Sequence, residues 1–174
     1  AQRVDVMARK RLNRALFGLS HPLGRYAELD DYDRINSQVL RDFYRQYYHS
    51  GNCSVYVSGK VTPEIVRCIE HHFGESAWGD TSRKMTHKTF QPVTEENKRI
   101  FIEKEDALQS SVKIGTFSIS QQHPDYLKLR VLVTLFGGYF GSRLMSNIRE
   151  DKGYTYGIGA GLVNYPGIGV LGIS

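Results

Sequence analysis

The most informative segment of the chain reads Leu135-Phe-Gly-Gly-Tyr-Phe-Gly-Ser-Arg-Leu-Met-Ser-Asn-Ile-Arg-Glu-Asp-Lys-Gly-Tyr-Thr-Tyr156. Its first glycines end one helix in a flexible loop, and a second helix then carries Arg149 near its C-terminal end. Gly153 is expected to turn the chain into a strand that opens with Tyr156. A guanidinium and a phenol on two elements that meet at one turn could converge on one oxygen atom. The plainer interpretation is that Arg149 complements the helix dipole and that Tyr156 packs on a sheet.

Strands and helices alternate around this segment. The apolar phase of one expected strand slips across Gly115, which predicts a β-bulge. Gly157, Gly159 and Gly161 leave one strand face bare, and a helix lying on that face is expected in preference to a ligand. The elements predicted in this half are a strand at 100–102, a strand at 112–120, a helix at 124–136, a helix from Ser142 to Lys152, and strands at 155–163 and 167–173.

The N-terminal half shows the same mixture of elements. Apolar residues recur at helical spacing from Val4 to Leu19, and Gly18 with the pair His21-Pro22 is expected to end that helix. No capping residue precedes this stripe, so we expect the helix to begin upstream and the chain to be a piece of a larger protein. The other elements predicted here are a helix from its cap at Asn36 or Ser37 to Gly51, a strand at 53–58, and a helix capped by Thr62, begun by Pro63 and ended by Gly74.

Both halves combine β-strands with helices that can cover one sheet face, which predicts an α+β fold with mixed or antiparallel sheets. Polar residues without a sustained period, from about Ser76 to Lys98, predict a linker between two units. The 174 residues are 40% apolar and 24% charged, which excludes disordered, collagen-like and coiled-coil chains. The longest apolar run, Val131 to Phe140, is broken by a threonine and two glycines, so no membrane span is expected.

The net charge and the cysteine content exclude few classes of function. The net charge of +5 is spread evenly along the chain, so it is weak evidence for an anionic partner, and no nucleic acid is expected. Cys53 and Cys68 are too few for a disulfide framework and are expected to be reduced, half-buried thiols. The segment carries no targeting signal, and its compartment stays open.

No metal site is expected within this chain. His71, His72 and Glu75 lie together, but consecutive residues of a helix point about 100° apart and cannot both face one ion. The helical zinc motifs H-E-x-x-H and H-x-x-E-H are absent, as is any Cys-x-x-Cys pair. The chain also lacks a Gly-x-Ser-x-Gly elbow and a Walker-type phosphate loop, so neither nucleophilic catalysis nor nucleotide binding is indicated.

The quoted segment resembles the signature of the second domain in the pitrilysin/insulinase family of zinc metallopeptidases, which includes the mitochondrial processing peptidases. That signature runs Leu-Gly-Gly-Gly, Ser-Arg-Leu, Leu-Arg-Glu, Lys-Gly and a Tyr. The first half agrees independently, because three further motifs occur in the family's order: Leu16-Phe-Gly-Leu-Ser-His-Pro-Leu-Gly-Arg25, Asp42-Phe-Tyr with Tyr47-Tyr48 and Asn52, and Val57-Ser-Gly-Lys-Val61. The resemblance covers nearly the whole chain.

The resemblance implies tandem α+β domains that close on a short or unfolded peptide. It assigns residues 1–78 to the C-terminal part of the first peptidase-like domain and residues 79–98 to a linker. Residues 99–174 would then form the N-terminal part of the second, metal-free domain. The zinc motif His-x-x-Glu-His, with its general-base Glu, would lie upstream of this chain, so zinc is expected there or in a partner subunit and not in these residues.

In such peptidases the second domain supplies an Arg and a Tyr, seven residues apart, that reach the substrate across the chamber. Arg149 and Tyr156 have that spacing, so the resemblance gives them a hydrogen-bonding role toward the peptide carbonyl as charge develops on it. The expected partners are a peptide substrate and the zinc-bearing domain or subunit. The chain alone is expected to be inactive, and whether its parent is an active zinc metallopeptidase stays open.

Two alternatives remain open from the sequence. A noncatalytic scaffold or partner subunit of the same family would keep the fold and place no demand on Arg149 and Tyr156. A single-stranded RNA-binding module comes from another class, since Lys152-Gly-Tyr-Thr-Tyr156 matches the start of the signature K/R-G-F/Y-G/A-F except at Thr155. If the fragment ends within a sheet, that sheet would expose an unpaired edge strand. A homodimer formed by pairing of such strands is therefore also possible from the sequence.

Overall fold

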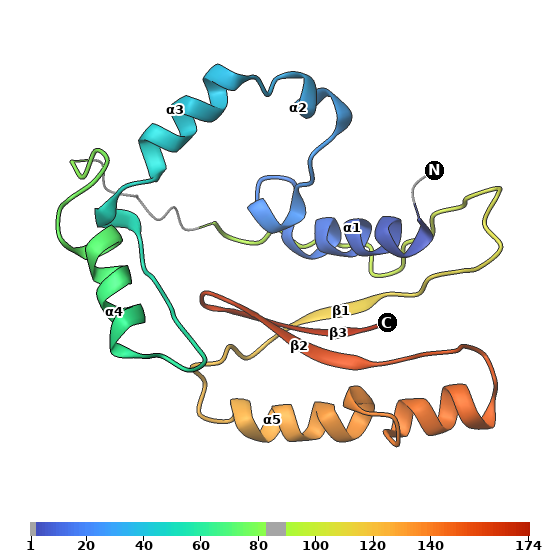
Figure 1. Ribbon diagram of the computed structural model, residues 1–174. Helices are drawn as coiled ribbons and strands as arrows, with labels where there is room; N and C mark the ends of the chain where they lie inside the picture. Colours follow the sequence, from blue (N-terminus) through green and yellow to red (C-terminus); the bar gives the residue numbers. More distant parts are fainter. Residues whose placement is uncertain (1–2, 83–89) are drawn as a thin grey trace. The chain divides into compact units, whose positions relative to one another are not determined.

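The chain forms two compact units in the computed structural model, which describes residues 3–82 and 90–174 (Figure 1). The first unit joins the N-terminal residues up to Tyr26 to the segment from Phe90 to Ser174. The second unit consists of the residues between these two parts. The predicted domain boundaries at 78 and 99 therefore do not coincide with these packing units, and the assignment to two peptidase-like domains stays a prediction.

The first unit contains an antiparallel sheet with helices, which confirms the predicted α+β class, but the helices lie on both faces and not on one. Figure 1 shows its three strands between α1 on one side and α5 on the other. Its elements are α1 (Val4–Phe17), the short turn η1 (Pro22–Gly24), β1 (Ile114–Ser118), α5 (Tyr126–Val133), η4 (Thr134–Gly138), η5 (Met145–Asp151), β2 (Ala160–Tyr165) and β3 (Ile168–Ile173). Both η4 and η5 are π-helical, with one extra residue per hydrogen-bonded turn.

The sheet is antiparallel with the strand order β1-β3-β2. The two residues Pro166 and Gly167 connect β2 to β3, and Gly167 has a φ of 77°. A proline followed by a glycine with positive φ is typical of a type II turn. This local signal sets the hairpin register, in which Tyr165 lies opposite Ile168.

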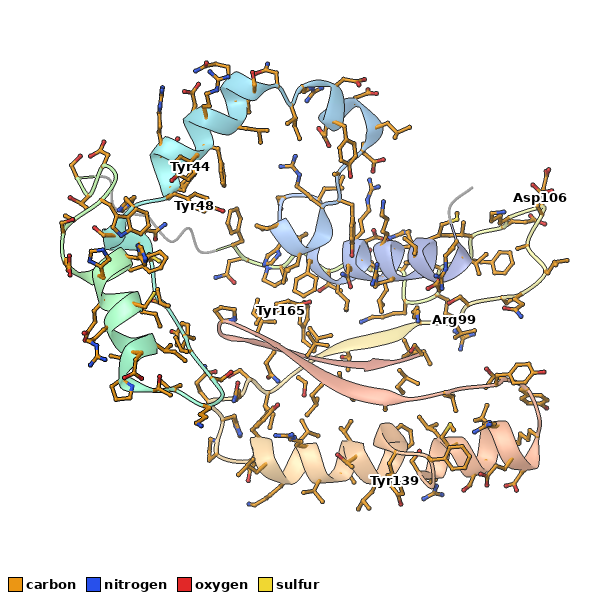
Figure 2. The ribbon with its side chains drawn as sticks, in the orientation of Figure 1. Tyr44, Tyr48, Arg99, Asp106, Tyr139 and Tyr165 are labelled. Atoms are coloured by element: carbon orange, nitrogen blue, oxygen red, sulfur yellow. The ribbon has the colours of Figure 1, made fainter. Side chains whose placement is uncertain are left out.

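The core of the first unit lies between the sheet and α1. Phe17 is only 1% exposed, and its ring stands nearly perpendicular to those of Phe117 and Tyr165 at centroid distances of 5.4 and 5.9 Å. Figure 2 shows Tyr165 near the β2–β3 hairpin, on the side of α1. Val170 of the central strand completes the buried cluster with Leu16. The opposite face of the sheet meets α5, where Asn164 Nδ2 donates to Tyr126 Oη over 2.7 Å.

The end of α1 is held by an extended segment from far along the chain. The last carbonyl groups of α1 accept hydrogen bonds from the backbone N–H of Val93, the hydroxyl of Thr94 and the backbone N–H of Glu95. These bonds satisfy acceptors that a helix end leaves without intrahelical partners. Gly18 follows the helix and ends it, as the sequence predicts.

The second unit is built from short helices. Its elements are α2 (Leu29–Asp33), α3 (Ser37–Tyr47), η2 (Ser50–Asn52), α4 (Pro63–Ile69) and the π-helical η3 (Glu70–Gly74). The predicted cap of α3 is confirmed, because Asn36 Oδ1 accepts from the backbone N–H groups of Gln38 and Val39 at 3.0 Å. Pro63 begins α4 as expected, but Thr62 makes no capping hydrogen bond.

Two predicted strands are wrong for this structure. Segment 53–58 alternates apolar with polar or exposed residues and segment 100–102 is apolar throughout, yet neither belongs to a strand. A strand requires a hydrogen-bonded neighbour, and among the described residues no backbone ladder reaches either segment. The residue pattern is a property of the local sequence, whereas strand formation depends on a pairing partner that the local sequence does not specify.

The expected bulge at Gly115 is also wrong, and β1 is shorter than the predicted 112–120. Five consecutive residues of β1 pair with β3 in an unbroken register, with Gly115 opposite Gly172 and Phe117 opposite Val170. Gly115 and Phe117 therefore share the face that packs on α1. The apolar phase slips because the position facing Leu12 holds a glycine and not an apolar side chain.

The remaining boundaries shift in the glycine-rich part of the chain. The predicted helix at 124–136 is divided into α5 and η4, and β2 begins at Ala160 and not at Thr155. The bare face is met by a helix only at its middle glycine: a Cβ on Gly159 would lie 3.3 Å from the carbonyl oxygen of Gly137 in η4, whereas a Cβ on Gly157 or Gly161 would meet nothing within 4 Å. In the described ranges, no helix is long and apolar enough to cross a membrane.

Candidate functional site

Arg149 lies in the last turn of η5, where the sequence places it. The side chain is half-buried, and its guanidinium carbon lies 4.7 Å from the centre of the Phe140 ring. No carboxylate among residues 3–82 and 90–174 forms an ion pair with Arg149. Its donors are therefore not neutralised by an acidic side chain in the described structure, so the helix dipole and the ring are its identified electrostatic partners.

Tyr156 follows the end of η5 after a sharp turn. Gly153 has a φ of 62°, a left-handed conformation that glycine adopts without steric cost. The backbone N–H groups of Gly153 and Tyr154 donate to the carbonyl groups of Arg149 and Ile148 at 3.1 Å, which closes the end of η5. Tyr156 is 94% exposed, so its phenol is available to a molecule that binds at the surface.

The structure places Arg149 and Tyr156 on one helix end and the segment that follows it. No hydrogen bond or ring contact joins the two side chains in the described part of the chain. The interpretation of Tyr156 as a residue packed on a sheet is not what the structure shows, since it precedes β2 and is exposed. Their convergence on one oxygen atom remains a prediction.

The ring of Phe140 is the feature that the sequence analysis missed. It lies nine residues before Arg149, in the loop between η4 and η5, where Figure 2 labels the adjacent Tyr139. Two adjacent aromatic residues in a glycine-rich loop carry no periodic signal. Only the path of the loop brings the ring beneath the guanidinium.

The histidine pair fits no zinc site. His71 Nδ1 lies 3.0 Å from Glu75 Oε2, and all three side chains of the group are exposed. Across residues 3–82 and 90–174, no group of three His, Cys, Asp or Glu side chains could hold a metal ion. Cys53 and Cys68 are free thiols that are exposed, where half-burial was expected.

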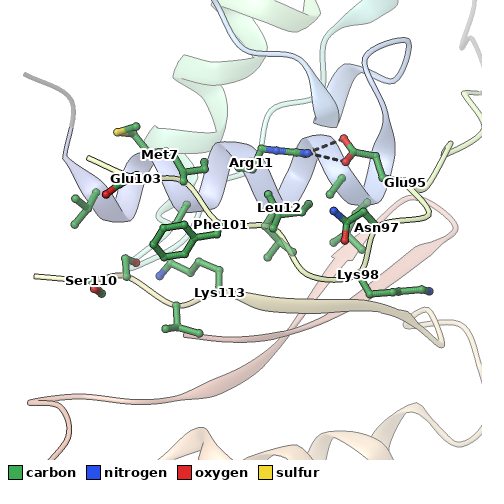
Figure 3. Close-up of a pocket in the computed structure, with 18 of the residues that line it drawn as sticks. Met7, Arg11, Leu12, Glu95, Asn97, Lys98, Phe101, Glu103, Ser110 and Lys113 are labelled. Atoms are coloured by element: carbon green, nitrogen blue, oxygen red, sulfur yellow. Dashed lines mark hydrogen bonds and ion pairs between the residues drawn. The ribbon is translucent and has the colours of Figure 1, made fainter. Parts of the chain in front are cut away.

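A cavity of about 640 Å³ lies elsewhere in the first unit, between α1 and the segment that leads to β1 (Figure 3). Figure 3 shows Arg11 reaching across to Glu95, with bidentate hydrogen bonds of 2.8 and 2.7 Å. These bonds hold the pKa of Glu95 below its ordinary value and raise that of Arg11. The pair ties the wall of the cavity to the helix, and neither Arg149 nor Tyr156 lines it.

The signature proposed for RNA binding is not arranged for that function. Base stacking on an RNA-recognition motif uses aromatic side chains that stand on sheet strands. Tyr154 and Tyr156 both precede β2, which begins at Ala160. The two tyrosines therefore form no stacking platform on the sheet.

Comparison with known proteins places these features in a family. The Peptidase M16 inactive domain family matches residues 34–174. A probable inactive metalloprotease of Bacillus subtilis, YmfF, is 28% identical over 81% of this chain and 33% of its own length. The uncharacterized zinc protease YmxG of the same species is 27% identical over 93% of this chain and 38% of its own. The chain thus spans about a third of the length of these relatives.

Solved structures agree in fold. A peptidase M16 inactive domain from Pseudomonas fluorescens superposes with a TM-score of 0.74 at 21% identity, covering 99% of this chain and 41% of that chain. A protease from Helicobacter pylori gives a TM-score of 0.67 at 18% identity, covering 96% and 41%. The resemblance drawn from the sequence motifs is confirmed. The family match extends over most of the residues, and this chain belongs to the peptidase M16 inactive domain family.

Proposed function

We propose that this chain is the metal-free, substrate-contacting part of a zinc endopeptidase that cleaves short or unfolded peptides. Family membership supports the assignment to a zinc protease system, and the name of the matched domain describes a part without the catalytic centre. The observation that carries the proposal is the Arg149 guanidinium, half-buried at the end of η5 and without an acidic partner among the described residues.

An arginine in this state suits a developing negative charge. Its guanidinium stays protonated at every physiological pH and offers five N–H donors in a planar arrangement. A partner carboxylate would occupy those donors and cancel the charge. No partner carboxylate is present in the described structure. The N–H donors can therefore bind a peptide carbonyl whose oxygen gains negative charge during nucleophilic attack.

Tyr156 would supply a second donor to the same oxygen. Its hydroxyl is a neutral donor, and its exposure leaves it free of competing contacts with the core. The turn at Gly153 fixes the path from η5 to Tyr156 through two backbone hydrogen bonds. We infer that closure on a substrate brings the Tyr156 hydroxyl and the Arg149 guanidinium to one carbonyl.

Among the described residues, no group of three His, Cys, Asp or Glu side chains could hold zinc. We infer that the upstream domain of the same protein, or a zinc-bearing partner subunit, holds the metal. Residues 1–78 would then complete that first domain, and residues 99–174 would begin the second. Peptide cleavage would need both parts.

The alternative is a noncatalytic scaffold or partner subunit of the same family. The relative named a probable inactive metalloprotease favours it, because it is 28% identical to this chain over 81% of the chain. In that case the fold would be kept, and Arg149 and Tyr156 would have no part in turnover.

The test is cleavage of an unstructured fluorogenic peptide. The chain is assayed alone and after mixing with the upstream region of its protein, each with and without a chelator. We expect the chain by itself to cleave no peptide, and the mixture with the upstream region to cleave the peptide in a reaction that the chelator stops. Cleavage by the chain alone would contradict the proposal, and an inactive intact protein would favour the scaffold.

A further inference from the structure

We propose that Phe140 is a positioning residue for Arg149, whose ring holds the guanidinium in place for the peptide. The inference rests on the proposed function, in which Arg149 contacts the substrate. The guanidinium carbon lies 4.7 Å from the ring centre, inside the range of about 6 Å over which a cation is attracted to an aromatic face. Phe140 is 64% exposed, so the pair lies at the surface, where a bound peptide can reach it.

The loop that carries Phe140 is itself fixed. The backbone N–H of Ser142 donates to the carbonyl of Tyr139 at 3.1 Å, which closes a turn with Phe140 inside it. Ser142 is fully buried, and its own carbonyl accepts from the N–H of Ser146. A Cβ on Gly141 would lie 3.0 Å from the Tyr139 ring, so that ring covers the glycine. The backbone of the turn that carries Phe140 is thereby anchored, and its ring contacts the Arg149 guanidinium from this position.

An aromatic ring suits this task better than a carboxylate would. The ring face attracts the positive charge without accepting its N–H hydrogens, which leaves the donors of Arg149 available to a substrate oxygen. A carboxylate would form charge-assisted hydrogen bonds that compete with the substrate. The Phe140 ring therefore restricts the long, flexible side chain of Arg149, while the charge and the N–H donors of Arg149 stay available to the substrate.

The test compares Phe140→Leu with Phe140→Trp in the peptide-cleaving mixture of this chain and its zinc-bearing region. Leucine keeps an apolar side chain but removes the aromatic face, and tryptophan keeps the face. Phe140→Leu is expected to lower kcat/KM about two- to fivefold, and Phe140→Trp to restore it. Phe101→Leu, which removes an exposed ring that makes no contact with Arg149, is expected to leave kcat/KM unchanged.

A double-mutant cycle separates positioning from general damage. In an Arg149→Ala background, Phe140→Leu is expected to cause no further loss of kcat/KM, because the ring then has no cation to hold. A loss that adds fully to that of Arg149→Ala would overturn the proposal, as would an unchanged Phe140→Leu enzyme. If Arg149→Ala alone has no effect, the proposed function fails, and the positioning role falls with it.

A second readout needs no activity. The Nε–H and Cδ–H resonances of Arg149 should show ring-current shifts in the wild-type chain, lose them in Phe140→Leu and keep them in Phe140→Trp. Wild-type resonances that already match those of Phe140→Leu would overturn the contact itself.

Discussion

Gly115 of β1 lies directly against Leu12 of α1. A Cβ built on the glycine would stand 3.0 Å from one Leu12 methyl carbon and 3.1 Å from the other. A third methyl carbon, from Leu16, would lie at 3.1 Å. The Leu12 and Leu16 side chains therefore stand so close to β1 that a methyl group on Gly115 would require them to shift by a few tenths of an ångström, and this contact seats α1 on β1.

Gly115→Ala is expected to lower the free energy of unfolding by about 1–3 kcal/mol, the usual cost of forcing a methyl group into a filled core. Gly161→Ala is the matched control, because Gly161 lies on the same sheet face and its Cβ would meet nothing within 4 Å. Urea unfolding of both variants measures the difference. Equal midpoints for the two variants would contradict the close packing of α1.

Gly137→Ala is expected to be more severe. A Cβ on residue 137 would lie 2.5 Å from the backbone nitrogen of Ala160 and 2.7 Å from the Cβ of Ala160. The backbone of η4 or of β2 would therefore have to move. We expect a loss of about 3 kcal/mol or more in the free energy of unfolding. The adjacent Gly138→Ala would meet only the Thr134 side chain at 3.3 Å and is expected to stay within about 1 kcal/mol of wild type.

The Arg11–Glu95 pair predicts a pH dependence of stability. The hydrogen bond from Arg11 lowers the pKa of Glu95 below its ordinary value near 4.5. A carboxyl group with a lowered folded-state pKa contributes stability above its unfolded pKa and loses it as the pH falls through the folded one. Glu95→Gln is expected to reduce the urea midpoint at pH 7 and to flatten its decline below about pH 4.5. Parallel acid profiles for variant and wild type would contradict this role.

Arg149→Ala and Tyr156→Phe test the proposed contact with the substrate. Each is expected to reduce turnover in the peptide-cleaving mixture by roughly 10²–10³-fold, the cost of losing one donor to a developing oxyanion. Tyr154→Phe is the control, since it changes a neighbouring exposed tyrosine in the same way. Steady-state kinetics with intact circular dichroism spectra distinguish a chemical effect from unfolding. Unchanged turnover in both variants would favour the scaffold.

Local chemistry made several features predictable. The Asn36 cap, the stop at Gly18 and the turn at Gly153 follow from backbone preferences that act over a few residues. The position of Arg149 near a helix end was predicted in the same way. The order of the short motifs carried the family resemblance, which the match over residues 34–174 confirmed.

Contacts between distant residues were not predictable. The phase slip at Gly115 suggested a bulge, because the sequence does not show that α1 occupies the space of the missing side chain. The segments 53–58 and 100–102 were expected to be strands, but a strand exists only where a neighbour pairs with it. The ring beneath Arg149 was likewise missed, since the path of the loop that carries Phe140 depends on the turn closed by Ser142.

The sequence by itself determined the family, the α+β class and several helix ends, and it proposed Arg149 and Tyr156 as candidates. It could do so because caps, turns and motif order are encoded in short, local patterns. Only the tertiary structure decided which strands pair, how closely α1 meets Gly115 and that Arg149 rests on Phe140. These outcomes depend on contacts between side chains from distant parts of the chain, and the periodicity of apolar residues along the chain does not specify such contacts.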